Sequence, residues 1–196
     1  MSTDAAVKHR DEFAETTLGF WVYLMTDCVL FASLFASFAV LRGGTANGPS
    51  GAEIFDLNFV LIETMLLLTS SLTSGLALVG LRTGSRRFVG VMLGLTFLLG
   101  AAFLGLELHE FSALVGEGNG WQTSAFLSSY FTLVGTHGLH IAVGLLWILV
   151  LTYSLFSRGI SNQFHKRLAL FSMFWHFLDI IWIFIFTIVY LLGAIT

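Results

Sequence analysis

The chain has 196 residues, of which 56% are hydrophobic and 11% charged, and its formal net charge is −3. A soluble domain carries about 25% charged residues, so this composition excludes a soluble enzyme and a disordered tail. Nine Lys and Arg residues supply no basic stripe for a phosphate backbone, which excludes a nucleic-acid partner. The one cysteine, Cys28, allows no internal disulfide and no cysteine-based metal site. The composition is that of a protein with several membrane spans.

Five runs of mainly apolar residues follow one another, each long enough to cross a hydrocarbon core about 30 Å thick. We therefore predict an all-α fold, a bundle of five transmembrane helices. The spans are expected at about residues 20–41, 57–81, 88–110, 126–156 and 168–192. Residues 1–19 are expected to form a cytoplasmic tail and residues 20–196 a single transmembrane domain, which leaves no room for a soluble catalytic domain.

The first two spans each bring one acidic residue to membrane depth, and the third has acidic residues at its outer end. Asp27 lies about 10 Å from the cytoplasmic end of the first span, and Glu63 lies about 9 Å from the outer end of the second. Glu107 lies at the outer side of the third span. A charged group at the centre of a membrane helix costs about 2.5–3.5 kcal/mol, so each of these residues needs a partner or a role.

The fourth and fifth spans carry histidines. Residues 126–156 would form a helix about 46 Å long, which must tilt or project beyond the membrane. His137 and His140 lie near its middle and could offer two imidazoles to a metal or haem. A di-iron bundle would need Glu-x-x-His on two helices, and the sequence contains no such motif.

His176 and Asp179 are three residues apart in the fifth span and therefore share a helix face. They form either a proton-handling or metal-ligating pair or a polar pair that fixes helix packing, and we favour the packing interpretation. Their depth places them with Asp27 in an inner group, whereas Glu63 and Glu107 form an outer group. Facing histidines, such as His140 and His176, could also hold a haem.

The basic residues predict the orientation, because they gather in cytoplasmic segments. Eight fall in segments expected on one side and one, Arg42, on the other. The eight are Lys8, Arg10, Arg82, Arg86, Arg87, Arg158, Lys166 and Arg167. We expect the N-terminus in the cytoplasm and the C-terminus in the periplasm.

Three segments together resemble subunit 3 of the haem–copper terminal oxidases, and the resemblance extends from Gly19 onward. They are Gly19 to Asp27, Thr136 to His140 followed by Gly144, and Trp175 to Trp182, with Glu107-x-x-Glu110 between the first two. Subunit 3 of cytochrome c oxidases typically has seven helices, and that of bacterial quinol oxidases has five. The chain therefore resembles most closely the bo-type ubiquinol oxidase members of the family.

The resemblance implies a supporting subunit of a proton-pumping ubiquinol oxidase in the bacterial inner membrane, with no catalytic residues, metal or redox centre of its own. Haems, copper and the quinol site would belong to subunit 1, a direct partner, with subunits 2 and 4 in the same complex. The chain would hold phospholipid in a cleft between helices. Asp27 matches a membrane-buried glutamate of the cytochrome c oxidase relatives, although as the shorter acid.

From shared depth we also expect Asp27, His176 and Asp179 to form one hydrogen-bonded network. Two alternatives from other functional classes remain at this point. One is a stand-alone five-helix electron carrier that binds haem, and the other is a small transporter that uses the buried acids as a proton relay.

Overall fold

A computed structural model describes residues 3–46 and 51–195, with side chains described for residues 15–46, 51 and 54–193. Pro49 lies outside the described residues, and the side chains of Lys8 and Arg10 lie outside the described side chains. The described chain is all-helical. Its elements are α1 (Thr3–Leu41), α2 (Gly51–Ile54), α3 (Leu57–Arg82), α4 (Arg86–Gly116), α5 (Ala125–Arg158), α6 (Asn162–Ile185), the π-helical turn η1 (Phe186–Leu191) and α7 (Leu192–Ile195).

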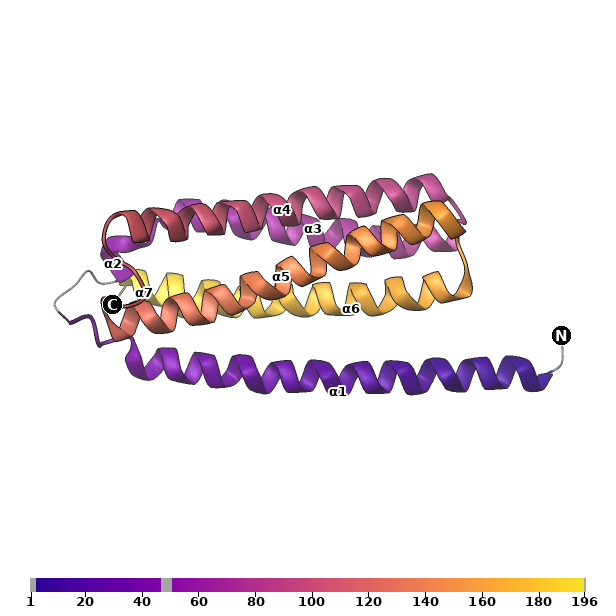
Figure 1. Ribbon diagram of the computed structural model, residues 1–196, viewed down its shortest axis with the longest axis horizontal. Helices are drawn as coiled ribbons and strands as arrows, with labels where there is room; N and C mark the ends of the chain where they lie inside the picture. The colour runs from indigo at the N-terminus through magenta and orange to yellow at the C-terminus, as the bar shows by residue number, and fades with distance from the viewer. Residues whose placement is uncertain (1–2, 47–50, 196) are drawn as a thin grey trace.

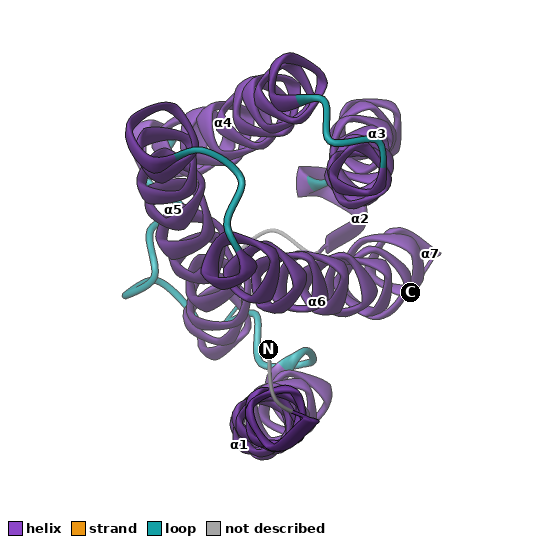
Figure 2. Ribbon diagram, turned by 90° about the vertical axis from the view of Figure 1, so that its right-hand side faces the viewer, coloured by secondary structure: helices purple, strands orange, loops and turns teal. Residues whose placement is uncertain are grey.

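Five helices are long and apolar enough to cross a membrane, as the sequence predicts. Four of them, α3 to α6, run side by side and enclose a common interior, whereas α1 lies along the outside of the bundle (Figures 1 and 2). Helix α1 packs against α5 and α6. Helix α5 is inclined relative to α4 and α6 (Figure 1), the tilt that a helix of 34 residues needs to fit a membrane.

The four bundle helices begin where a polar side chain satisfies a free backbone N–H of the first turn. Asp56, Ser85, Ser124 and Ser161 are the N-caps of α3, α4, α5 and α6. Such caps typically contribute about 1 kcal/mol each. Helix α5 ends at Gly159, whose φ of 76° suits a residue without a Cβ.

Some helices extend beyond the apolar spans. Helix α4 continues to Gly116, and α1 begins at Thr3, inside the segment 1–19 that the sequence analysis treats as a tail. The apolar pattern marks where a helix enters lipid, but backbone hydrogen bonding continues past that point. The short helix α2 has no counterpart among the predicted elements. The turn η1 lies within the predicted span 168–192, but its π-helical register was not predicted.

The middle of the bundle is built around a tryptophan that enters a notch of small residues. Trp175 of α6 is fully buried, and its indole N–H donates to Ser70 Oγ of α3 at 3.1 Å. A Cβ on Gly144 would lie 2.5 Å from the Trp175 ring, and one on Gly100 would lie 2.9 Å from it. The two glycines therefore allow α4 and α5 to close on the indole from two sides, as small residues do in membrane bundles.

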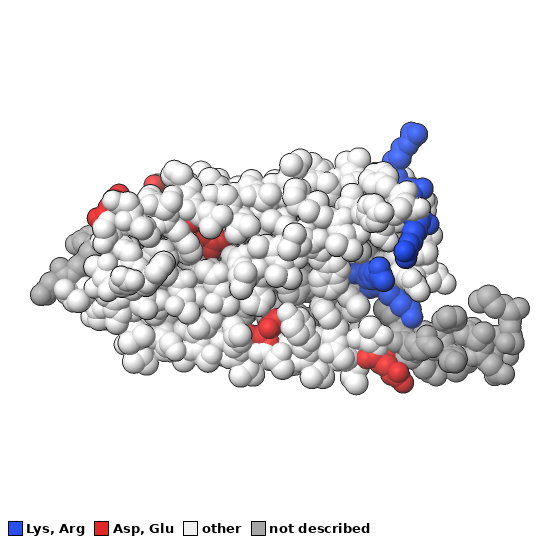
Figure 3. All heavy atoms as spheres, viewed as in Figure 1, with Lys and Arg blue, Asp and Glu red and all other residues white. Residues whose placement is uncertain are grey.

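With the exception of Arg42, the described basic side chains gather at one end of the bundle (Figure 3), where α3 and α5 end and where α4 and α6 begin. Arg86 of α4 is held there by the final turn of α5, because its guanidinium donates to the carbonyl oxygens of Leu155 and Phe156. Asp and Glu side chains are sparse along the apolar flank that Figure 3 shows. This distribution fits the charge pattern of the sequence, and the side of the membrane that the basic end faces stays a prediction.

Candidate functional site

Two glutamates lie in the interior of the bundle, away from its basic end. Glu63 of α3 is 0% exposed and Glu107 of α4 is 1% exposed, and within the described part of the chain no hydrogen-bond partner reaches their carboxyl oxygens. A Cβ on Gly138 of α5 would lie 3.0 Å from Glu107 Oε2, so the glycine makes room for the carboxyl group. The Glu63 and Glu107 carboxyl groups are close enough for the charge of one to affect the other, so the two residues of the predicted outer pair lie in the same region.

The same region contains a hydrogen-bonded chain of three residues from three elements. The Tyr190 hydroxyl donates to Glu110 Oε2 at 3.2 Å, and the Tyr130 hydroxyl lies 3.0 Å from that of Tyr190. Because Tyr190 uses its one proton toward the carboxylate, Tyr130 is the donor to Tyr190. Tyr190 lies in η1, and π-helical turns occur frequently at functional sites. The outer group thus consists of Glu63, Glu107, Glu110, Tyr130 and Tyr190.

His137 belongs to the aromatic interior of the bundle. It is fully buried and stacks on Trp182, with ring centroids 5.3 Å apart, and the edge of Phe103 meets it at 6.0 Å. Trp182 is anchored in turn by its indole N–H, which donates to Thr64 Oγ1 at 3.0 Å. His137 therefore packs α5 against α6 and α4.

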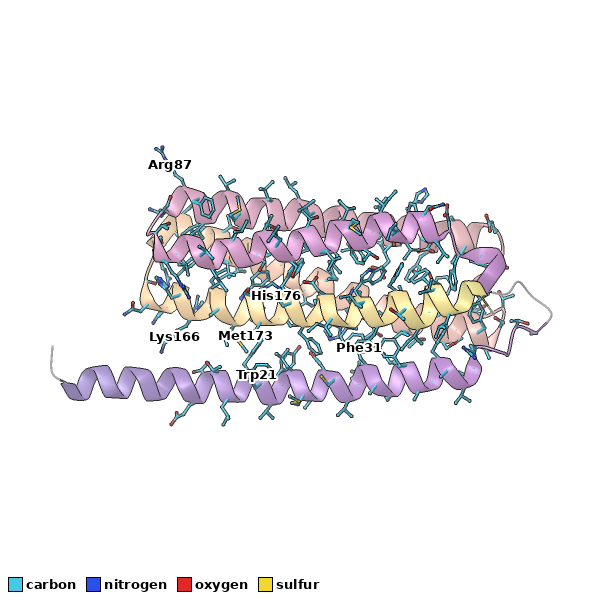
Figure 4. The ribbon with its side chains drawn as sticks, turned by 180° about the vertical axis from the view of Figure 1, so that it is seen from behind. Trp21, Phe31, Arg87, Lys166, Met173 and His176 are labelled. Carbon is cyan, nitrogen blue, oxygen red and sulfur yellow. The ribbon has the colours of Figure 1, made fainter. Side chains whose placement is uncertain are left out.

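His140 faces a different interface from His137. Its Nδ1–H donates to the Thr136 carbonyl oxygen of the preceding turn at 2.7 Å, which directs Nε2 toward Asp27 at 3.8 Å. Asp27 is buried and belongs to α1. Phe31, which rises from α1 toward the bundle (Figure 4), lies against the His140 ring at 5.3 Å. The Asp27–His140 pair is thus a polar link between α1 and the rest of the bundle.

His176 and Asp179 share a face of α6 as predicted, with His176 Nδ1 and Asp179 Oδ2 3.7 Å apart. His176 Nδ1 also shares a 2.6 Å hydrogen bond with Ser71 Oγ of α3. Figure 4 shows His176 near the middle of α6.

The expected network of Asp27, His176 and Asp179 is wrong. Asp27 pairs with His140 at the α1–α5 interface, whereas His176 and Asp179 face α3. The three residues were grouped by their expected depth in the membrane, and depth does not fix the direction in which a helix face points.

The two histidines that could have held a haem do not face one another. His140 points to α1 and His176 to α3, so the geometry gives no support to an axial pair. In the described parts of the chain, no three His, Cys, Asp or Glu side chains are grouped as metal ligands.

Comparison with known proteins decides the family. The model of the family described as cytochrome c oxidase subunit III matches residues 5–194. The chain belongs to this family. Subunit 3 of the cytochrome bo(3) ubiquinol oxidase of Pseudomonas aeruginosa is 56% identical over 185 residues, which cover 94% of this chain and 88% of that protein.

Two other relatives are named after oxidases that differ in their electron donor. Cytochrome c oxidase subunit 3 of a Bacillus species is 48% identical over 178 residues, or 91% of this chain and 86% of that one. Quinol oxidase subunit 3 of Bacillus subtilis is 44% identical over 193 residues, or 98% and 95%. This chain is therefore similar over most of its length both to subunits named for quinol oxidases and to subunits named for cytochrome c oxidases.

Membership of the cytochrome c oxidase subunit III family, together with the five spans, makes the chain a multi-pass protein of the bacterial inner membrane and a subunit of an oxidase complex. Its buried polar side chains lie at several helix interfaces. Glu110, Tyr130 and Tyr190 were not predicted to belong to the outer group. Glu110 is three residues from Glu107 and shares its helix face, a signal that was readable. The two tyrosines carried no comparable signal.

Proposed function

We propose that the chain is subunit 3 of a proton-pumping bacterial quinol oxidase that oxidises ubiquinol and reduces oxygen to water. Its role is to stabilise the complex and to hold phospholipid, and it carries no catalytic residues and no redox centre. Ubiquinol is proposed as the electron donor because the relative at 56% identity is named as a subunit of a ubiquinol oxidase. Haems, copper and the quinol site belong to subunit 1 in this proposal.

The arrangement of the polar contacts is the main support for a structural role. Most polar contacts between the described helices join two elements at a time, and the outer group is an exception, with side chains from four elements. Asp27 and His140 join α1 to α5, Ser71 and His176 join α3 to α6, and Glu110 and Tyr190 join α4 to η1. Such contacts fix helix positions and leave the rest of the surface to neighbouring molecules.

The outward faces favour a membrane partner. Large apolar side chains are exposed along α1, among them Leu18, Val29 and Val40, and similar residues cover the outside of α5. Within a membrane these faces require lipid or another membrane subunit against them. We propose subunit 1 as the direct partner and subunits 2 and 4 as further members of the complex. The basic end is proposed to face the cytoplasm.

The isolated chain tests this function against its two alternatives. We expect the full chain, purified alone and reconstituted into liposomes, to show no Soret band and no proton-coupled uptake, because the redox groups and the proton pump belong to subunit 1. Absorbance after growth with added haem precursor measures the first, and a pH-sensitive dye trapped in the liposomes measures the second.

A haem spectrum that is lost in the His140→Ala or His176→Ala variant would contradict the proposal in favour of an electron carrier. Proton uptake that is lost in Glu107→Gln, with Cys28→Ser as the control variant, would contradict it in favour of a transporter. Cys28 is exposed and suits this control because it has no part in the outer group.

A further inference from the structure

Three buried side chains in the half of the bundle away from its basic end have polar atoms without a hydrogen-bond partner in the described part of the chain. They are the carboxyl oxygens of Glu63 and Glu107 and both ring nitrogens of His137. None of the three residues is more than 1% exposed. Buried polar groups in proteins almost always have a partner, so each of these exceptions needs a physical explanation.

The three residues meet in one region of the interior, although they belong to three helices. A Cβ on Gly138 of α5, the residue after His137, would lie 3.0 Å from Glu107 Oε2. The Trp182 indole stacks on His137 and donates a hydrogen bond to the side chain of the residue that follows Glu63. The unpartnered groups therefore converge from α3, α4 and α5.

No positive charge balances the two unpartnered carboxyl groups. Within the described side chains, neither Glu63 nor Glu107 forms an ion pair or a hydrogen bond with Lys or Arg. His137 is packed between the rings of Trp182 and Phe103, where an imidazolium without a partner would itself be costly. An isolated buried carboxylate is so unfavourable that the group takes up a proton instead. Burial without a counter-charge therefore favours the neutral acid.

Glu110 differs from the other two glutamates because it has hydrogen-bond donors. The Tyr190 hydroxyl donates to Glu110 Oε2 at 3.2 Å, and the Tyr130 hydroxyl supports that of Tyr190 at 3.0 Å. Donors of this kind stabilise the charged form of a carboxyl group, so Glu110 can remain ionised. Its negative charge acts on both Glu63 and Glu107 and makes their ionisation still less favourable.

From these contacts we propose that Glu63 and Glu107 form a proton-binding site that holds at least one proton at neutral pH. The proton belongs to the pair rather than to either residue, because two neighbouring carboxyl groups titrate together. The titratable groups that face the site are Glu110 of α4, Tyr130 and His137 of α5, and Tyr190 of η1. The site gives the subunit a group that binds protons, in addition to the structural role proposed above.

Infrared spectroscopy of the full chain in mild detergent tests this site, because a protonated carboxyl group has a C=O stretching band that a carboxylate lacks. We expect the band at neutral pH, and we expect it to shift in D2O. The double variant Glu63→Gln/Glu107→Gln should lose the part of the band that the pair contributes. Glu117→Gln is the matched control, since it makes the same substitution at an exposed residue at the end of α4 and should leave the band unchanged.

The double variant is designed to preserve the fold. Glutamine has nearly the shape of the protonated acid and carries no charge, so near-ultraviolet circular dichroism should stay unchanged. A band that is absent from the unaltered chain at neutral pH would overturn the proposal, whether or not the variants fold. An undiminished band in the folded double variant would overturn it as well. Co-purification with an oxidase tests the proposed function separately.

Discussion

Replacing Gly144 by alanine is expected to lower the free energy of unfolding by about 1–3 kcal/mol, and replacing it by leucine should prevent the bundle from closing. The added Cβ would lie 2.5 Å from the Trp175 ring. The ring cannot retreat, because Gly100 approaches it closely on another side and its N–H is bound to Ser70. Titration with sodium dodecyl sulfate in mild detergent, followed by near-ultraviolet circular dichroism, measures the effect.

Gly94→Ala is the matched control for this experiment. It makes the same substitution in the third turn of α4, where a Cβ would meet no atom within 4 Å. Its stability should stay equal or rise slightly, because alanine is the better helix former. If Gly144→Ala and Gly94→Ala had the same effect, the close packing of Trp175 in its notch would be wrong.

Replacing Trp182 by alanine is expected to cost about 3–5 kcal/mol of unfolding free energy, the range for removing a large aromatic side chain from a core. The indole packs edge-on against Phe103 at 4.6 Å, stacks on His137 and donates to Thr64. Its loss would open a cavity where α3, α4 and α5 meet α6. The same detergent titration measures the change.

Two further variants separate the causes of that loss. Trp182→Phe keeps most of the aromatic packing but removes the hydrogen bond to Thr64, so it should cost clearly less than Trp182→Ala. Trp121→Ala removes a tryptophan that is 58% exposed, and it should change stability by less than about 0.5 kcal/mol. An equal effect at positions 121 and 182 would contradict the buried location of Trp182.

Hydropathy predicted the number and order of the spans because each helix had to present about 20 apolar residues to lipid. It placed the second span at 57–81, close to α3 at Leu57–Arg82. It ended the third at residue 110, although α4 reaches Gly116, because helical hydrogen bonds do not stop where polar residues begin. The π-helical turn η1 escaped prediction because a change of one backbone hydrogen-bond register leaves no mark in the apolar pattern.

The polar contacts were harder to predict than the spans. The spacing of His176 and Asp179 placed them on one face because the interaction is local to one helix. Asp27 was assigned to the wrong partners because its pairing with His140 depends on how α1 is rotated and which helix it packs against. The spacing of residues within one helix gives no information on the rotation of that helix or on its packing partner. The Tyr130–Tyr190–Glu110 chain joins three elements and was missed for the same reason.

Purification of the chain from its native membrane by an added tag, in mild detergent, tests the central claim most directly. We predict that a larger haem-bearing subunit co-purifies in fixed ratio, and that the preparation oxidises ubiquinol with uptake of oxygen. The visible spectrum, a stained gel and an oxygen electrode supply the three readings. A chain that purifies alone, or with a haem subunit that oxidises reduced cytochrome c and not ubiquinol, would contradict the account.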